Sequence, residues 1–396
     1  MSTERVQACL DKFTADERGR IVGLRRELHA HPELSWDERV TQATITRELA
    51  RLGINDVRPV AGTGLVATIP GTVPGAPVIA LRGDIDALPI TEETGLPFSS
   101  KNPGVMHACG HDMHASWVVA AGLLLKKDPA AGEVRLILQP AEELGEGANK
   151  MIEEGALDGV STIFGGHVDW RFQLGEIVAV SGPLAASSDS FEVTFHGKGG
   201  HGARPQDAID PVVGLAAFIM EVQTLVSRRL DPGLPGVVTV GVVMAGSASN
   251  VIPERSRCAG TIRATTPEAR ALLCDGVKAL AESVAATHRL RAEVVLSEGT
   301  PPLVNTAQAT GYAQQAARTL LDEGALKMLA MPNMGAEDFA FYTERMDGCF
   351  LRIGTLGEGR SRAGVHTPRF DPDESALFVA AAVLAESARV ASANGR

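Results

Sequence analysis

The order of strand-like and helix-like segments between residues 191 and 296 constrains the fold of this chain more than any other feature. Apolar patterns predict strands and helices at 191–195 (strand), 211–227 (helix), 237–244 (strand), 258–264 (strand), 267–288 (helix) and 292–296 (strand). This β-α-β-β-α-β order is typical of a ferredoxin-like α+β unit, and about 115 residues is an ordinary size for one. We therefore predict that residues 186–300 form an inserted domain.

The segments on either side of this insert alternate between helices and strands. Two helices are expected between residues 20 and 53, and buried strands are expected at 78–81, 134–138 and 163–167. Alternation of this kind predicts an α/β fold with a mainly parallel sheet. Because 396 residues exceed one ordinary core, we expect residues 1–185 and 301–396 to form one main domain that the insert interrupts.

Charge and cysteine content limit the partners and the compartment. A formal net charge of −11, without a basic cluster, disfavours nucleic acid and favours a small-molecule partner. Residues 1–13 carry several charges and do not resemble a signal peptide, and no run approaches the ~18 apolar residues of a membrane span. Five scattered cysteines suit a reducing compartment, so we expect a cytoplasmic protein.

Residues 106–114 gather side chains that can bind a metal ion. The stretch contains His107, Cys109, His111, Asp112 and His114. Any one of these residue types alone is more often an ordinary core or surface residue. Their density, between a proline-containing loop and an apolar helix, instead favours a metal site.

Further potential ligands follow predicted strands elsewhere in the chain. Glu142 and Glu143 come just after one strand, His167 ends another, and His366 lies in a polar loop. In open α/β sheets the carboxyl ends of the strands converge on one crevice, so residues that are distant in sequence become neighbours. A borderline-soft ion such as Zn²⁺ accepts thiolate, imidazole and carboxylate ligands together.

A series of short motifs runs in order along nearly the whole chain. The motifs are Arg82–Pro89, Met106–His114, Gln139–Glu143, Gly165–His167, Gly199–Pro205, Asn250–Glu254, Gly335–Ala340 and Val365–Pro368. With them the sequence resembles the M20 metallopeptidase family, and specifically its amidohydrolase branch of aminoacylase, hippurate hydrolase and auxin-conjugate hydrolase relatives. The branch usually has Ala where Gly83 stands, a change that affects backbone freedom and not ligation.

The resemblance implies a pair of divalent ions, drawn from Zn²⁺, Mn²⁺, Co²⁺ and Ni²⁺. The implied ligands are Cys109, His111, Glu143, His167 and His366, with Cys109 bridging. Asp86 is expected to serve catalysis by orienting a histidine ligand through its free ring nitrogen. His107, Asp112 and His114 are expected to support the site.

Glu142 is implied as the general base of the reaction. Neighbouring residues of an extended chain project in opposite directions, so we expect Glu143 to bind metal while Glu142 faces the water. Glu142 would take a proton from this water and later pass it to the leaving amine.

The inserted domain carries the remaining candidates. His201, in the glycine-rich loop 196–202, is expected to donate to the oxyanion, and Asn250 and Arg263 are expected to bind substrate. The resemblance implies that the domain is a lid and the contact of a homodimer, in which His201 serves the partner's active site. The loop has two other interpretations: a phosphate cradle, whose usual spacing before Gly-Lys-Ser/Thr is missing, and a plain glycine-rich turn.

The predicted function is hydrolysis of the linear amide bond of N-acyl amino acids, such as N-acetyl or N-benzoyl compounds, by metal-activated water. A dinuclear dipeptidase or aminopeptidase is the nearest alternative, because it shares the chemistry and differs only in the free amino group of its substrate. A non-catalytic metal-binding protein is a third alternative, but it would not need Glu142 beside Glu143.

Overall fold

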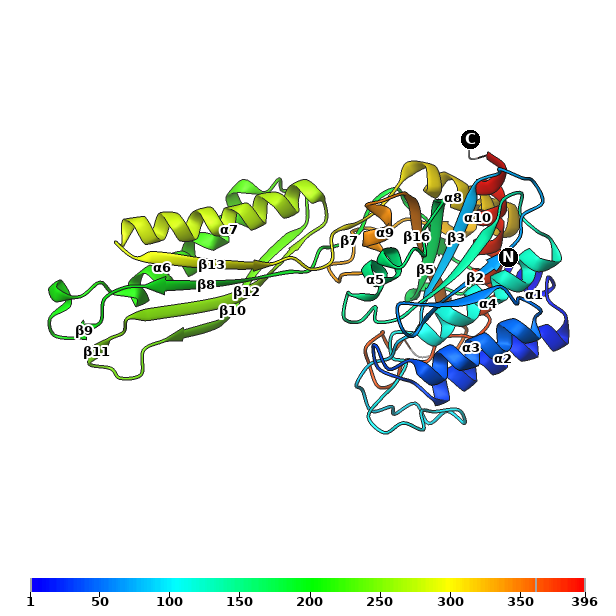
Figure 1. Cartoon of the computed structure of the whole chain (residues 1–396), viewed down its shortest axis with the longest axis horizontal. Coiled ribbons are helices and arrows are strands. Elements are labelled where there is room, and N and C mark those ends of the chain that lie inside the picture. Colours follow the sequence, from blue (N-terminus) through cyan, green and yellow to red (C-terminus); the bar gives the residue numbers. More distant parts are fainter. Residues whose placement is uncertain (1, 360–361, 395–396) are drawn as a thin grey trace. The chain divides into compact units, whose positions relative to one another are not determined.

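The computed structural model of the protein describes residues 2–359 and 362–394. The chain forms two compact units, which consist of Met1–Gly182, Asn305–Ala330 and Phe341–Arg396 in the first and of Pro183–Val304 and Met331–Ala340 in the second (Figure 1). Residues 331–340 are expected from the sequence to belong to the main domain. They group with the second unit because Asn333 N–H donates to Leu184 O and Ala186 N–H donates to Asn333 O, both at 2.9 Å.

An eight-stranded sheet, counted over the described residues, forms the centre of the first unit. In spatial order its strands are β1 (Val57–Val60), β2 (Gly64–Ile69), β4 (Val134–Gln139), β3 (Val78–Asp84), β5 (Val160–Gln173), β16 (Asp347–Leu356), β6 (Ile177–Val178) and β15 (Leu326–Lys327). The central strands β4, β3, β5 and β16 run parallel, which confirms the predicted α/β fold with a mainly parallel sheet. The antiparallel pair β1–β2 is not predicted, because β1 is short and contains Pro59, which weakens the strand signal.

Helices cover the sheet and supply much of the apolar core. α4 (His111–Lys127) packs on β3 and β4, and α10 (Ala376–Asn394) lies beside α4 on β3 and β5. α8 (Ala307–Leu321) contacts α10 and β16. α2 (Ala15–Ala30) packs on α4, and together with α3 (Arg39–Arg51) it accounts for the two helices predicted between residues 20 and 53. The remaining short helices are α1 (Ser2–Leu10), α5 (Gly147–Glu153) and α9 (Ala340–Thr343).

Within the described residues, two helices are long and apolar enough to cross a membrane, judged by length and composition alone. One is α10, and 78% of its apolar window is buried inside the protein, as in the core helix of a globular domain. The other spans Pro211–Arg229 in the second unit and is 33% buried. The sequence is expected to contain no run that approaches the ~18 apolar residues of a membrane span. Burial in the core accounts for the apolar composition of α10.

The second unit contains an antiparallel sheet of β8 (Asp189–His196), β10 (Gly236–Ala245), β12 (Arg255–Ala264) and β13 (Arg291–Ser297). The spatial order is β10-β12-β8-β13, and α6 (Pro211–Thr224) and α7 (Pro267–Thr287) cover one face of the sheet (Figure 1). This is the ferredoxin-like arrangement that the sequence predicts. Two smaller sheets pair β9 (Gly200–His201) with β11 (Val251–Ile252), and β7 (Gly182–Ala185) with β14 (Leu303–Asn305).

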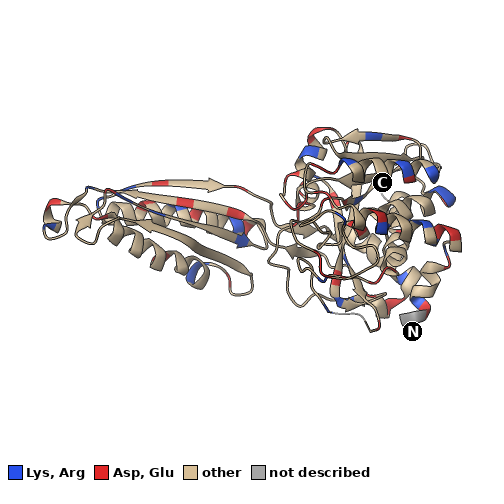
Figure 2. Ribbon diagram, turned by 90° about the horizontal axis from the view of Figure 1, so that it is seen from below, with Lys and Arg blue, Asp and Glu red and all other residues tan. Residues whose placement is uncertain are grey.

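Charged residues of both signs are interspersed along the elements of each unit (Figure 2). With a formal net charge of −11, the chain lacks the excess of basic residues that favours polyanionic partners.

Gly83 allows α4 to lie very close to β3. A Cβ atom at this position would lie 2.6 Å from the carbonyl oxygen of His114 and 3.1 Å from Val118 Cγ2. The carbonyl group belongs to the backbone of α4, so it cannot move aside without a shift of the helix. Gly83 is therefore a packing requirement of this chain.

We predict that Gly83→Ala lowers the free energy of unfolding by about 1–3 kcal/mol, the usual cost of overpacking a core. Gly23→Ala is the matched control, because Gly23 lies in α2 with nothing within 4 Å of an added Cβ. It should raise stability by up to about 1 kcal/mol through helix propensity. Urea unfolding of both variants tests the prediction, and a Gly83→Ala protein as stable as the wild type would contradict it.

Candidate metal centre

The five predicted metal ligands lie in the first unit and come from separate parts of the chain. Cys109 precedes α4, His111 is the first residue of α4, and Glu143 follows β4. His366 lies in the loop before α10. His167 is expected from the sequence to end a strand. In the structure β5 continues past His167 to Gln173, because β16 pairs with this further part of the strand. His167 therefore projects from within a long strand.

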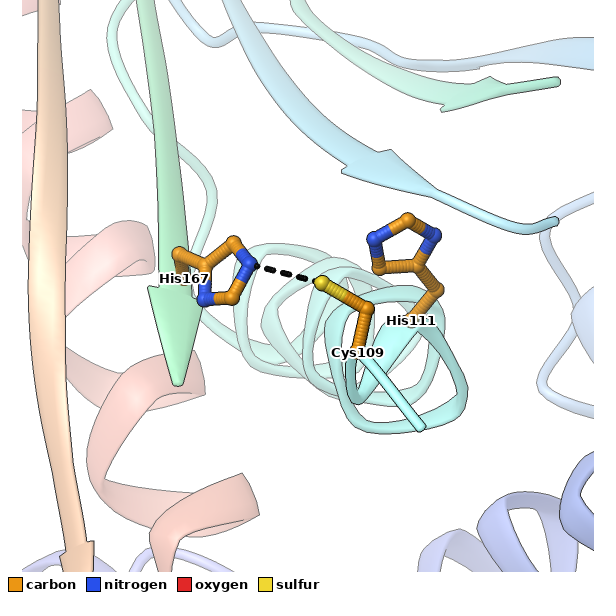
Figure 3. A group of neighbouring side chains, drawn as sticks. All are labelled: Cys109, His111 and His167. Atoms are coloured by element: carbon orange, nitrogen blue, oxygen red, sulfur yellow. Dashed lines mark hydrogen bonds between the residues drawn. The ribbon is translucent and has the colours of Figure 1, made fainter. Parts of the chain in front are cut away.

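Cys109 lies at the centre of this group. Its Sγ atom is 3.2 Å from His167 Nε2 (Figure 3) and 3.3 Å from His366 Nε2. Glu143 Oε1 is 3.8 Å from His111 Nε2 and 3.6 Å from His366 Nε2. Two overlapping triplets, Cys109–His111–His167 and Cys109–Glu143–His366, each hold their potential ligand atoms within 4.8 Å of one another. The sulfur belongs to both triplets, which is the position that a bridging ligand needs.

The polar atoms left without partners at this point fit a cation. His111 Nε2 and Glu143 Oε1 are buried and have no hydrogen-bond partner among the described residues. Buried polar atoms without partners are rare, and each calls for a water molecule or an ion. The donor set of thiol, imidazole and carboxylate suits a borderline-soft divalent ion.

Hydrogen bonds on the far ring nitrogens turn two imidazoles toward this point. His111 Nδ1–H donates to Asp86 Oδ1 at 3.0 Å, which leaves Nε2 for a ligand role. His167 Nδ1–H donates to the carbonyl oxygen of Val168 at 2.7 Å, which leaves its Nε2 facing Cys109. Both tautomers are therefore the ones that a metal ligand requires.

Asp86 connects two of the predicted ligands. In addition to the bond from His111, its Oδ2 accepts from the Glu143 N–H at 3.0 Å and from Ser35 Oγ at 2.8 Å. Burial alone would raise the pKa of Asp86, but the hydrogen bond and charge of His111 hold it below its ordinary value. The contact expected of Asp86 is present, and the carboxylate also fixes the backbone of Glu143.

Two predicted ligands resist deprotonation in the absence of a cation. Burial raises the pKa of Glu143 to about 7, with Asp86 adding to the rise and His111 opposing it. Burial, aided by the charge of Glu143, also raises the pKa of the Cys109 thiol well above its ordinary value. Carboxyl and thiol groups bind metals in their deprotonated forms, so metal binding here would release protons.

The turn after β4 brings both glutamates to the same imidazole. Ala141 has a left-handed backbone conformation (φ 51°), and its N–H donates to Glu38 Oε1 at 2.9 Å. Glu142 Oε2 lies 3.9 Å from His111 Nε2, and Glu143 approaches the same atom. The expectation that the two side chains project in opposite directions is therefore wrong, because residues 142–145 form a turn and not an extended chain.

His107, Asp112 and His114 are all buried. Asp112 Oδ2 lies 2.8 Å from both Arg25 Nε and His29 Nδ1. Arg25 and His29 belong to α2, lie outside all of the motifs and are not predicted from the sequence. Neither ring nitrogen of His107 has a hydrogen-bond partner among the described residues, and burial lowers the pKa of His107 to about 4. Asp112 is therefore tied to α2, and its expected supporting role acts through Arg25 and His29.

The structure brings His201 and Asn250 together but leaves Arg263 apart from them. All three lie in the second unit. Gly202 N–H donates to Asn250 O at 2.8 Å, which joins the loops that carry His201 and Asn250. Arg263 lies at the other end of β12, where its Nη1 donates to Ser187 O at 3.4 Å. One copy of the second unit therefore does not gather the three predicted substrate-binding residues.

Comparison with known proteins gives the class to which this fold and site belong. Residues 80–389 match the sequence profile of peptidase family M20/M25/M40. The chain is 42% identical over 373 residues to N-acetyl-L-cysteine deacetylase of Bacillus subtilis (strain 168), covering 93% of this chain and 87% of that protein. It is 40% identical over 374 residues to IAA-amino acid hydrolase ILR1-like 2 of Arabidopsis thaliana, covering 93% and 84%.

A solved structure agrees with these sequence matches. The crystal structure of a dinuclear metal-binding M20 peptidase from Bacillus subtilis superposes with a TM-score of 0.83 at 38% identity, covering 94% of this chain and 98% of that one. The chain therefore belongs to peptidase family M20/M25/M40, and within it to the amidohydrolase branch. It is a hydrolase that acts on amides.

We predict different effects for Glu142→Gln and Glu143→Gln. Glu143→Gln weakens a ligand and should lower the metal content of the purified protein. Glu142→Gln should retain metal while kcat falls by roughly 10²–10⁴, the range attributed to general acid–base catalysis. Metal analysis together with kcat at saturating metal separates the two effects. Loss of metal in Glu142→Gln alone, with activity recovered by excess ion, would mean that the roles are reversed.

Proposed function

We propose that the protein is a metal-dependent amidohydrolase that cleaves the amide bond of N-acyl amino acids. The observation that carries this proposal is the cluster around Cys109, in which both Glu142 and Glu143 reach His111. One carboxylate completes the ligand set, and the other is left to move a proton. The sequence relatives N-acetyl-L-cysteine deacetylase and IAA-amino acid hydrolase ILR1-like 2 support the substrate class.

The residues proposed to hold two divalent ions are Cys109, His111, Glu143, His167 and His366. Such ions would supply a water molecule of lowered pKa and would polarise the scissile carbonyl group. One thiol and three imidazoles favour a transition-metal ion over Mg²⁺ or Ca²⁺, which prefer oxygen ligands. Zn²⁺, Mn²⁺, Co²⁺ and Ni²⁺ are the candidates that metal analysis of the purified protein would distinguish.

The protein's own groups have separate tasks in the proposed reaction. Glu142 accepts a proton from the attacking water and delivers it to the leaving amine. Asp86 keeps His111 in one tautomer and holds the backbone of Glu143 in place. Asp86 and His111 are buried, and a low-dielectric surrounding of this kind strengthens the electrostatic interactions that they make.

A paired assay tests the substrate class. N-acetyl-L-leucine and glycyl-L-leucine share the same amide and the same amino acid, and differ mainly in the free amino group. We expect a much higher kcat/KM for the acyl compound, and loss of activity after removal of metal by a chelator. Faster cleavage of the dipeptide would establish the dipeptidase alternative. Metal binding without hydrolysis of either compound, or of N-benzoyl and longer acyl analogues, would favour a non-catalytic protein.

We propose that His201 donates a hydrogen bond to the developing oxyanion. Ala203 N–H donates to His201 Nδ1 at 3.0 Å, so the proton of the neutral ring lies on Nε2. The exposed Nε2–H group is then a donor, as an oxyanion requires. Asn250 lies next to this loop and is proposed to bind substrate with it, while Arg263 is proposed to bind substrate from its separate position on β12.

Backbone contacts in the same loop do not favour the phosphate-cradle alternative. A phosphate cradle needs free backbone N–H groups that point at the anion. In this loop Gly197 N–H donates to Glu254 O at 2.8 Å, and Lys198 N–H donates to Ile209 O at 2.9 Å. Gly202 N–H is also bonded to a carbonyl oxygen. These donors are occupied, so the loop instead serves to present His201.

We propose a homodimer that forms through one edge of the second unit. β10 is an edge strand, and it contacts α6. Large apolar side chains on both elements are exposed: Val212, Val213 and Met220 on α6, and Val242, Val243 and Met244 on β10. A free strand edge beside an exposed apolar surface is typical of an interface between copies. A two-fold axis at β10 would continue the sheet into the second copy.

Subunit exchange tests whether His201 acts on the partner's site. His201→Ala should bind metal normally yet lose most of its kcat, because an oxyanion donor acts chiefly on the transition state. Mixed with inactive Glu142→Gln, it should form hybrid dimers that contain one site with both groups intact, so activity should reappear. His196→Ala is the control, since His196 is a half-buried histidine of the same unit whose Nε2 pairs with Glu293, and it should remain fully active. Verified exchange without recovery of activity would contradict action on the partner.

We propose a cytoplasmic location. The five described cysteines are free, and four of them are buried. Free thiols of this kind are compatible with a reducing compartment.

A further inference from the structure

His114 lies behind the metal centre, with a partner on each ring nitrogen. It belongs to α4 and is completely buried. Its Nε2 accepts a hydrogen bond from the Val168 N–H at 3.0 Å, and its Nδ1 lies 2.6 Å from Asp84 Oδ1. Because Nε2 accepts, the ring proton lies on Nδ1 and is donated to Asp84. The imidazole is held at both ends and is not available as a metal ligand.

Val168 connects this ring to the predicted ligand His167, which projects from β5 toward Cys109 (Figure 3). The Val168 carbonyl accepts the His167 Nδ1–H at 2.7 Å, so the position of this residue sets the orientation of the ligand ring. β3 pairs with β5 only as far as Gly165. Beyond that residue His114 takes the place of a strand neighbour and accepts the Val168 N–H.

Asp84 is itself fixed from the core of the sheet. Arg82 Nη1 donates to Asp84 Oδ2 at 2.5 Å, and Arg82 Nε donates to Gln139 Oε1 at 2.8 Å. The Tyr342 hydroxyl donates to the same oxygen of Gln139 at 3.0 Å. A continuous set of hydrogen bonds therefore runs from the interior of the sheet to the Val168 backbone.

We propose that His114 is a positioning residue of the metal centre, which holds the Val168 backbone and through it aims His167 at the metal position. This inference rests on the metal site of the proposed function. The His114 ring also meets the His167 ring edge to face, with centroids 4.6 Å apart. Loss of an outer partner of a metal ligand typically weakens metal binding by about 10–100-fold.

A packing role alone would have different consequences. The His114 ring stacks on Trp117, with centroids 4.5 Å apart and planes inclined by 28°. A phenyl ring at position 114 would preserve most of this stacking and fill the same space, but it would accept nothing from Val168 and donate nothing to Asp84. If His114 served only to fill the core, His114→Phe would bind metal as the wild type does.

The experiment compares the wild type with His114→Phe, His114→Gln and the control Trp117→Phe. Each protein is prepared free of metal and titrated with Zn²⁺ against a chromophoric chelator, and its melting temperature is measured without metal. We expect His114→Phe to lose roughly 10–100-fold in affinity for one ion. His114→Gln should recover most of this loss, because its side-chain carbonyl can accept the Val168 N–H. Trp117→Phe leaves both hydrogen bonds intact and should match the wild type.

Cobalt substitution gives a second readout that does not depend on turnover. The Cys109 thiolate has no hydrogen bond to His114, so its charge-transfer absorption should persist in His114→Phe at saturating Co²⁺. The ligand-field bands should change, because the imidazole of His167 is misdirected.

Several outcomes would overturn the proposal. Wild-type affinity in His114→Phe would do so, and so would equal losses in His114→Phe and His114→Gln, because the hydrogen bond to Val168 would then be irrelevant. If His114→Phe does not fold, His114→Gln decides: a loss of tenfold or more contradicts the role. A wild-type protein that binds no ion would instead refute the proposed function, and this inference with it.

Discussion

The burial of ionisable side chains around Cys109 is the constraint on which the rest of the first unit depends. Asp84, His111 and His114 are completely buried, and an unpaired charge in such a place costs several kcal/mol even after relaxation. Most of these groups are stabilised by hydrogen bonds within the protein, among them the pair formed by His114 and Asp84. His111 Nε2 and Glu143 Oε1 lack such partners among the described residues. The free-energy cost of burying these two atoms is therefore one that bound cations would offset.

The parallel sheet brings these groups to one edge. β3 and β4 run side by side and end in segments that carry Asp86 and Glu143, and α4 begins at the same edge with His111. β5 continues past its neighbour β3 because β16 supports its additional length, so His167 reaches the other ligands from the side. The site is therefore built from strands of unequal length. Beyond Gly165, β5 has no strand partner on the β3 side, so the Val168 N–H requires an acceptor that a regular sheet would have supplied.

Much of the fold could be predicted from the sequence, because its signals are local. Periodicity predicts the parallel sheet and the ferredoxin-like order of the second unit, and the dense motif around Cys109 marks the metal centre whatever its detailed geometry. Two local arguments fail, both because they assume ideal strand geometry. The glutamates Glu142 and Glu143 lie in a turn held by Glu38, and His167 lies within its strand, since tertiary contacts determine where an extended segment ends.

The contacts that support the ligands could not be predicted in the same way, because their partners are far apart in sequence and depend on distances between elements. The position of the His114 ring depends on how closely α4 approaches β3, and Gly83 permits that approach. Because Gly83 is not a potential metal ligand, ligand chemistry alone gives no reason for a glycine at this position. In the structure it lies against the backbone of His114, whose ring holds Val168 and, through it, His167. Gly83, which has no side chain to contribute to the site, thus helps to set the position of a predicted metal ligand on a different strand.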